Sequence, residues 1–203
     1  LTLIDGVRVN DPSSPGGGFD FGNLLIGNLD RVEVLRGPNS VPWGSQAIGG
    51  VVNIITARPG SANNRTLRAE YGSNDRANLV GQYGISGDRI SASLGGGYFR
   101  DDGISAAASG SEADGYKQYA ANGALEVKLS DTVSIDLRGF YAHSRAELDG
   151  FPPPLYSLSD TPEYSTGQQL IGYAGINASF GDLRNRIALT VNDINRDNFA
   201  APG

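Results

Sequence analysis

From residue 65 onward, apolar and polar residues alternate along the chain with a period of two. The stretch 89–98 shows this clearly, because Ile90, Leu94 and Tyr98 alternate with Ser91 and Ser93. Such a period places successive side chains on opposite faces of a β-strand. The same pattern predicts about seven antiparallel strands, over residues 65–71, 76–86, 89–98, 122–129, 132–141, 168–180 and 186–194.

The connections between these strands fall into two classes. Short turns rich in Gly, Asp and Ser occur at 87–88, 130–132 and 181–182, whereas the connections at 100–115 and 144–165 are long; the brief first turn at 72–75 is the exception to this alternation. In an up-and-down sheet every second connection lies at the same end, so the long loops share one end and these turns share the other. Alternation alone also fits a soluble β-sandwich. Short turns at one end and long loops at the other are typical of outer-membrane β-barrels, so the arrangement of the connections favours that class.

The first 60 residues have a different pattern. Residues 1–10 predict a strand that ends in a turn at Asp11-Pro12, and residues 23–29 predict a short helix capped by Asn23. Residues 31–35 predict a second strand, which ends at Arg36-Gly37-Pro38 because proline lacks a backbone donor. A glycine-punctuated loop follows, and then the β-branched strand 51–56.

Composition excludes several classes of function. The chain has no cysteine, so it has neither disulfides nor thiolate metal ligands. Its net charge of −6 argues against a nucleic-acid partner, which requires a basic face. No apolar run approaches the ~20 residues of a transmembrane helix, and no signal peptide precedes the first predicted strand. His143, the single histidine, has no neighbouring nucleophile, so we expect no enzyme activity.

The most specific motifs lie in residues 1–56. They are Leu3-Ile4-Asp5-Gly6, Arg31-Val32-Glu33, Arg36-Gly37-Pro38 and the run Trp43–Thr56. Together they resemble the end of the plug domain of TonB-dependent outer-membrane receptors. The resemblance implies a mixed fold, with the C-terminal half of an α+β plug (1–60) followed by strands of a transmembrane β-barrel (61–203). It also implies an internal fragment of a receptor in the outer membrane of a Gram-negative bacterium. The implied partners are the membrane lipid and TonB, which would act through an N-terminal segment that this chain lacks.

A second, shorter resemblance points to the vitamin B12 (cobalamin) branch of that family. It rests on Gly97-Tyr98, Asp114-Gly115-Tyr116, Gly123–Glu126, Arg138–Tyr141 and Leu158–Thr161. That branch binds calcium through loop carboxylates, and the calcium orders the loops for cobalamin. By position, the resemblance assigns calcium to Glu112, Asp114, Asp149 and Asp160, and cobalamin contacts to Ser13, Ser14 and Gly150. Ser105 replaces one family carboxylate, which leaves the number of calcium ions open.

Two alternative functions remain open at this point. A ferric-siderophore receptor shares the same plug motif, and a soluble all-β binding module with calcium-stabilised loops would share the acidic loops. Within the plug, Arg31, Glu33 and Arg36 would need partners in a poorly solvated interface. We expect these partners among Arg68, Glu70 and Arg89 of the barrel.

Overall fold

Two β-sheets make up the computed structural model, which describes residues 1–11, 17–19, 21, 24–25, 29–57, 65–108 and 110–200. The small sheet has the strand order β2-β1-β4-β3, in which β1 and β4 are parallel and the other pairs are antiparallel. Its strands are β1 (Thr2–Ile4), β2 (Val7–Arg8), β3 (Leu29–Arg36) and β4 (Gly50–Thr56). Between β3 and β4 lie one turn of helix, α1 (Ser40–Trp43), and a 3₁₀ turn, η2 (Ser45–Ala47).

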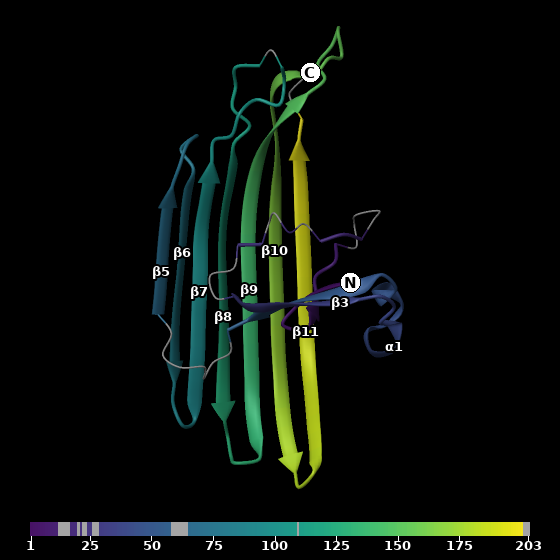
Figure 1. Cartoon of the computed structure of the whole chain (residues 1–203), viewed down its shortest axis with the longest axis vertical. Helices are drawn as coiled ribbons and strands as arrows, with labels where there is room; N and C mark the ends of the chain where they lie inside the picture. Colours follow the sequence, from purple (N-terminus) through teal and green to yellow (C-terminus); the bar gives the residue numbers. More distant parts are fainter. Residues whose placement is uncertain are drawn as a thin grey trace.

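The large sheet is an antiparallel meander of seven strands in sequence order, β5 to β11. Its strands are β5 (Arg65–Tyr71), β6 (Ala77–Ser86), β7 (Ile90–Asp101), β8 (Tyr116–Lys128), β9 (Val133–Gly150), β10 (Ser159–Phe180) and β11 (Leu183–Phe199). Figure 1 shows the two long connections at one end of this sheet, together with the brief β5–β6 turn, and the other short turns at the opposite end. The predicted strand number, meander order and sorting of the connections are therefore confirmed.

The last four strands are longer than the sequence pattern predicts. Residues 144–150 and 159–165 were expected to lie in a loop, but most of them pair with each other in the β9–β10 ladder, with Ser165 opposite Ala146 and Ser159 opposite Gly150. The true connection is only 151–158. Along 144–150 the apolar positions change face, since Ala146 and Leu148 lie on the face of Phe140 while Arg145 and Glu147 lie on the other. Residues 159–165 are mostly polar on both faces, so the pattern of the band no longer marks the strands although the backbone pairing continues.

The prediction of one strand over residues 1–10 is also wrong. Asp5 and Gly6 have φ angles of 51° and 83°, which form a tight turn between β1 and β2. An Asp-Gly pair is the usual sequence of such a hairpin turn. The predicted helix at 23–29 falls partly on Asn23 and residues 26–28, outside the described residues; Leu24 and Leu25 are not helical, and Leu29 begins β3.

The small sheet packs on one face of the large sheet. Ile4, Val7 and Ile54 form a buried cluster with Phe140 and Ile171 of β9 and β10. Figure 1 shows the small sheet crossing the long strands near their middle. We call this face of the large sheet the inner face. The opposite face of the large sheet, formed by the alternate side chains of each strand, is called the outer face.

The outer face of the large sheet is apolar and exposed. Leu67 is 78% exposed and Leu189 is 77% exposed, and Leu94, Leu137 and Ile176 are also exposed there. Eight residue steps separate Tyr98 from Ile90 on β7, about 27 Å along the strand. This length is close to the ~25 Å apolar band of a transmembrane barrel, once the strand tilt is allowed for. Among the described residues, no helix is long and apolar enough to cross a membrane.

Candidate functional site

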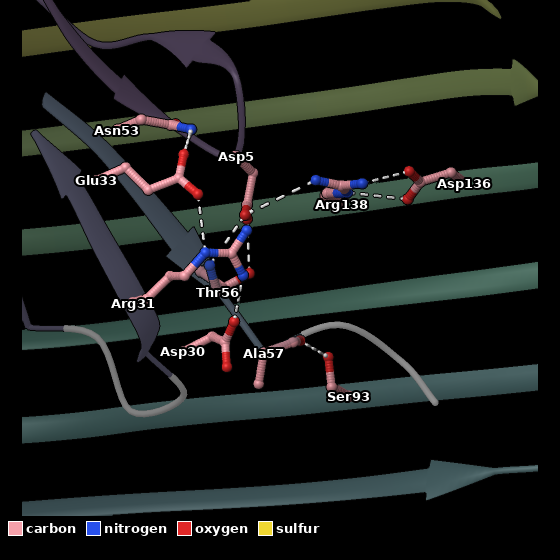
Figure 2. Close-up of polar contacts among 10 residues, drawn as sticks. All are labelled: Asp5, Asp30, Arg31, Glu33, Asn53, Thr56, Ala57, Ser93, Asp136 and Arg138. Atoms are coloured by element: carbon pink, nitrogen blue, oxygen red, sulfur yellow. Dashed lines mark hydrogen bonds and ion pairs between the residues drawn. The ribbon is translucent and has the colours of Figure 1, made fainter. Parts of the chain in front are cut away.

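An ion pair joins the small sheet to the wall formed by the large sheet. Asp5, in the β1–β2 turn, lies 3.7 Å from Arg138 of β9. The same carboxylate accepts hydrogen bonds from the backbone N–H and the hydroxyl of Thr56, at 2.9 and 2.6 Å. Figure 2 shows Arg138 between Asp5 and Asp136, which lies two residues before it on β9. Arg138 is therefore shared by one carboxylate of the small sheet and one of its own strand.

Two further hydrogen bonds connect the sheets at other points. The Ser93 hydroxyl of β7 donates to the carbonyl of Ala57 at 3.2 Å, just after β4 ends. The Asn192 amide of β11 donates to the carbonyl of Arg8 in β2 at 3.1 Å. The small sheet is thus held at three separate strands of the wall.

The structure shows ionic partners for Arg31 and Arg68 other than the predicted ones, and the partners of Arg36 and Arg89 stay a prediction. Arg31 pairs with Asp30 and Glu33 at 2.7 and 2.8 Å, and Glu33 also accepts a hydrogen bond from Asn53. Arg68 pairs with Glu70 on its own strand β5. The hydrogen bonds from Arg31 to Glu33 and Asp30 raise the pKa of the Arg31 guanidinium, and the bond to Glu33 has the larger effect. Residues two apart on a strand lie on the same face, so neighbours within the sheet neutralise one another.

A glycine of the wall makes room for the plug. Gly97 lies on the inner face of β7, and a Cβ added there would approach the Leu25 side chain at 3.0 Å. Leu25 packs against the buried cluster beneath the small sheet. The glycine run 95–97 thus includes a packing position that any larger residue would obstruct.

Above this interface, toward the long loops, a cavity of about 320 Å³ opens between the small sheet and β9–β11. The small-sheet side contributes Val9, Asp11, Gly18 and Phe19, and the wall contributes Ala142, Ser144, Gly167, Gln168, Gln169, Ile194, Asn195 and Arg196. Phe19 packs edge-to-face on Phe21, with ring centroids 5.1 Å apart. The cavity therefore combines an aromatic ring, amide groups, a guanidinium and the Asp11 carboxylate.

The predicted ligand contacts are only partly placed by the structure. Ser13 and Ser14 lie outside the described residues, although Asp11 before them and Gly18 after them both line the cavity. Gly150 is buried at the end of β9, where an added Cβ would meet Glu163 and Thr161 at 2.7–2.8 Å. Gly150 therefore packs tightly at the base of the loop, and its contact with a ligand stays a prediction.

The structure brings two of the four predicted calcium ligands together. The Ser105 hydroxyl lies 3.4 Å from Asp149 and 3.0 Å from Asp160. Asp160 also accepts the backbone N–H groups of Ser111 and Glu112, at 2.7 and 2.9 Å. Asp114 accepts the backbone N–H of Ala106 at 2.6 Å.

In the part of the chain that the structure describes, no three Asp, Glu, His or Cys side chains converge to hold a metal. Asp149 and Asp160 tie the loop 102–115 to β9 and β10, whereas Asp114 accepts a hydrogen bond within the loop itself. The calcium site stays a prediction.

Phe19 and Arg196 are cavity residues that the sequence analysis did not identify. The predicted last strand stopped at 194, so the inner-face position of Arg196 was not assigned. Alternation from Thr190 and Asn192, both on the inner face, would have located it once the strand was extended to Phe199. Phe19 follows a glycine-rich loop and carries no periodic pattern, so the sequence gives no comparable indication.

Comparison with known families gives one match. Residues 1–51 match the model of the TonB-dependent Receptor Plug Domain. The match covers β1, β2, β3, α1 and η2 and reaches the start of β4. The prediction that the N-terminal part is plug is therefore confirmed over these residues. That family consists of transport receptors rather than enzymes.

Solved structures of similar fold cover nearly the whole chain. The ferric-catecholate import receptor Fiu from Escherichia coli K12 matches 97% of this chain with a TM-score of 0.75 and 16% identity. The siderophore receptor PiuA from Acinetobacter baumannii matches 95% with a TM-score of 0.67 and 16% identity. The ferripyoverdine receptor of the outer membrane of Pseudomonas aeruginosa, bound to ferripyoverdine, matches 100% with a TM-score of 0.67 and 15% identity.

These matches cover 32%, 29% and 29% of the three receptors, so the chain spans about a third of their length. At these identities the likeness establishes the fold. The predicted fold class, part of a plug followed by seven antiparallel strands of a barrel, is confirmed. The predicted location in the outer membrane of a Gram-negative bacterium is confirmed as well, because the plug family and these receptors belong to that membrane.

Proposed function

We propose that this chain is part of a TonB-dependent receptor that binds a ferric siderophore at its extracellular end and imports it. The observation that carries the proposal is the cavity between the small sheet and β9–β11, on the loop side of the plug. The solved structures of similar fold include a siderophore receptor and a ferric-catecholate import receptor. This support favours a siderophore over cobalamin, which the loop motifs had suggested.

Three side chains of the cavity suit an anionic ferric complex with aromatic or amide groups, and they lie together with the Asp11 carboxylate of the small-sheet side. Arg196 supplies a permanent positive charge, because guanidinium groups stay protonated in proteins. Phe19 offers a ring on which a catecholate or phenolate group can stack. Gln169 adds an amide that both donates and accepts hydrogen bonds. Cobalamin would make less use of the guanidinium, since it carries no strongly anionic face comparable to a ferric catecholate.

Import requires that the plug leave its position, and the Arg138 contact suits a reversible release. An arginine left unpaired in a buried interface would be costly. Arg138 keeps Asp136 as a partner when Asp5 moves away, and Asp5 keeps its hydrogen bonds to Thr56. We therefore propose that energy delivered by TonB separates the small sheet from the wall at this contact, with little electrostatic penalty on either side.

Ligand titration of the intact receptor in detergent tests the proposal. We expect ferric siderophores to bind and cobalamin to bind at least a hundredfold more weakly. Arg196→Gln should weaken siderophore binding about tenfold or more, because a hydrogen bond to a charged group contributes roughly 1.5–3 kcal/mol. Arg184→Gln is a matched control, since Arg184 lies on the same face of β11 near the short turns.

Each outcome has a distinct meaning. Tight cobalamin binding without siderophore binding would return the assignment to the cobalamin branch. Siderophore binding that is equally tight in Arg196→Gln and the unaltered receptor would place the ligand outside this cavity. Equal losses in Arg196→Gln and Arg184→Gln would indicate a general charge effect instead of a contact.

A further inference from the structure

A glycine of β10 lies at the floor of the cavity between the small sheet and the wall. Gly167 is directly opposite Arg196 of β11 on one side and Ser144 of β9 on the other. All three residues line the cavity and therefore share the inner face. Because Gly167 has no side chain, a gap remains between the side chains of Arg196 and Ser144, and we call this gap the slot.

The fold itself does not require glycine at position 167. Its φ angle is outside the positive range that favours glycine. Among the described residues, the one atom within 4 Å of an added Cβ is the Ser144 hydroxyl oxygen, at 3.0 Å, and rotation about χ1 moves such an oxygen. Gly175, on the same face of β10, differs, because a Cβ there would lie 2.5 Å from the Tyr173 hydroxyl. Glycine weakens the interior of a strand, and it often marks a place where a ligand approaches the backbone closely.

The slot has the width of one aromatic ring. Neighbouring strands are about 4.8 Å apart, so β9 and β11, which flank β10, are about 10 Å apart. A ring that stands on its edge contacts the groups on either side at about 3.5–4.0 Å, and it fits within this width. Phe19, on the small-sheet side of the cavity, offers a second aromatic surface to the part of a ligand that projects from the slot.

We propose that Gly167 determines specificity by admitting the aromatic ring of a catecholate group into the slot. This inference rests on the proposed siderophore function and names the class of siderophore. The ring lies against the backbone of β10, in the space that a side chain at position 167 would fill. Its negatively charged oxygens accept hydrogen bonds from the Arg196 guanidinium, and hydrogen bonds between charged groups are the stronger ones. A hydroxamate group is smaller than this ring, so it depends less on the missing side chain.

The test titrates the intact receptor in detergent with a ferric tris-catecholate and with a ferric trihydroxamate siderophore. We expect the unaltered receptor to bind the catecholate more tightly. Gly167→Val should weaken catecholate binding about tenfold or more and hydroxamate binding less than about threefold, because atoms added to a filled space disrupt packing there. Gly172→Val is the matched control. Gly172 alternates with the buried Ile171 and so lies on the outer face of β10, where the nearest atom to an added Cβ is the Val191 Cβ at 4.0 Å.

We expect Gly172→Val to bind both siderophores within about twofold of the unaltered receptor. Equal catecholate affinity in Gly167→Val and the unaltered receptor would overturn the inference and leave the siderophore assignment intact. Equal losses for the two siderophores, or binding of the hydroxamate alone, would do the same. Binding of neither siderophore to the unaltered receptor would overturn the proposed function together with this inference. Valine favours strands more than glycine does, so thermal unfolding should show that both variants keep their fold. Gly167→Ala, which adds one methyl group, keeps the test valid should Gly167→Val misfold.

Discussion

At the scale of single residues, Asp5 connects the plug to the wall of the barrel. We expect Asp5→Ala to destabilise the plug by about 1.5–3 kcal/mol, because Thr56 loses two hydrogen bonds to a charged group. Arg138 keeps Asp136, so the wall should stay folded. Limited proteolysis and denaturant unfolding of the intact receptor measure the two effects separately.

Arg31→Gln is the comparison for Asp5→Ala, since Arg31 belongs to an exposed pair. Exposed ion pairs contribute about 0–1 kcal/mol, so its plug should resist protease nearly as well as the unaltered one. Equal protease sensitivity of Asp5→Ala and the unaltered receptor would show that Asp5 does not hold the plug.

Residue roles were predictable from the sequence only where they are local. The Asp5-Gly6 pair predicts a turn by itself, because both residues tolerate positive φ. The partner of Asp5 was not predictable, since Arg138 is 133 positions away and its contact depends on how the two sheets pack. Arg31 illustrates the opposite error: a distant partner was expected, although Glu33 lies two residues along the same strand.

At the scale of elements, the loop 102–115 tests the calcium prediction. Calcium at Asp149 and Asp160 would have to displace the backbone N–H groups that Asp160 now accepts. We therefore expect added calcium to change amide hydrogen exchange across 105–112, and Asp160→Asn to abolish that response. The substitution keeps the size of the side chain but removes the charge that a hard cation requires.

Glu126→Gln serves as the control for this experiment, because Glu126 lies on the inner face near the short turns, far from the loop. Its exchange response to calcium should match that of the unaltered receptor. Should calcium and a chelator leave exchange identical in the unaltered receptor, the metal site is discarded, and Asp149 and Asp160 act only as anchors for backbone N–H groups.

The strands themselves were largely predictable, and the reason for the exceptions is physical. Within the apolar band, lipid on one face and the lumen on the other impose alternation, so all seven strands were found. Beyond the band the apolar positions of β9 change face and β10 is mostly polar over 159–165, although the ladder of the two strands continues. Periodicity reports the environment of side chains, whereas strand length here follows backbone pairing.

At the scale of the whole molecule, the docking of two sheets creates the candidate site. Each part was largely predictable from the sequence by itself: the plug through its motifs, and the barrel wall through the alternation of apolar and polar residues. The cavity, in contrast, needs Phe19 from one sheet and Arg196 from the other, and nothing in either local pattern specifies that they meet. The cavity is therefore a property of the packed assembly.

A reversible crosslink between the sheets separates binding from import. Arg8 and Asn192 are in contact between β2 and β11, and this chain has no cysteine to interfere. In the double variant Arg8→Cys, Asn192→Cys we expect a disulfide that holds the plug on the wall. Siderophore affinity should stay within about threefold of normal, because the cavity lies on the loop side of this contact. Such a change corresponds to less than about 1 kcal/mol of binding free energy.

Import by cells that carry the double variant should stop under oxidising conditions and recover when a reductant opens the disulfide. Each single cysteine variant should import normally in both conditions, which controls for loss of the Asn192 hydrogen bond. Import that continues with the disulfide closed would mean that the plug can open a path without separating from β11, and release would then have to occur along the β7 and β9 contacts at Ser93 and Arg138.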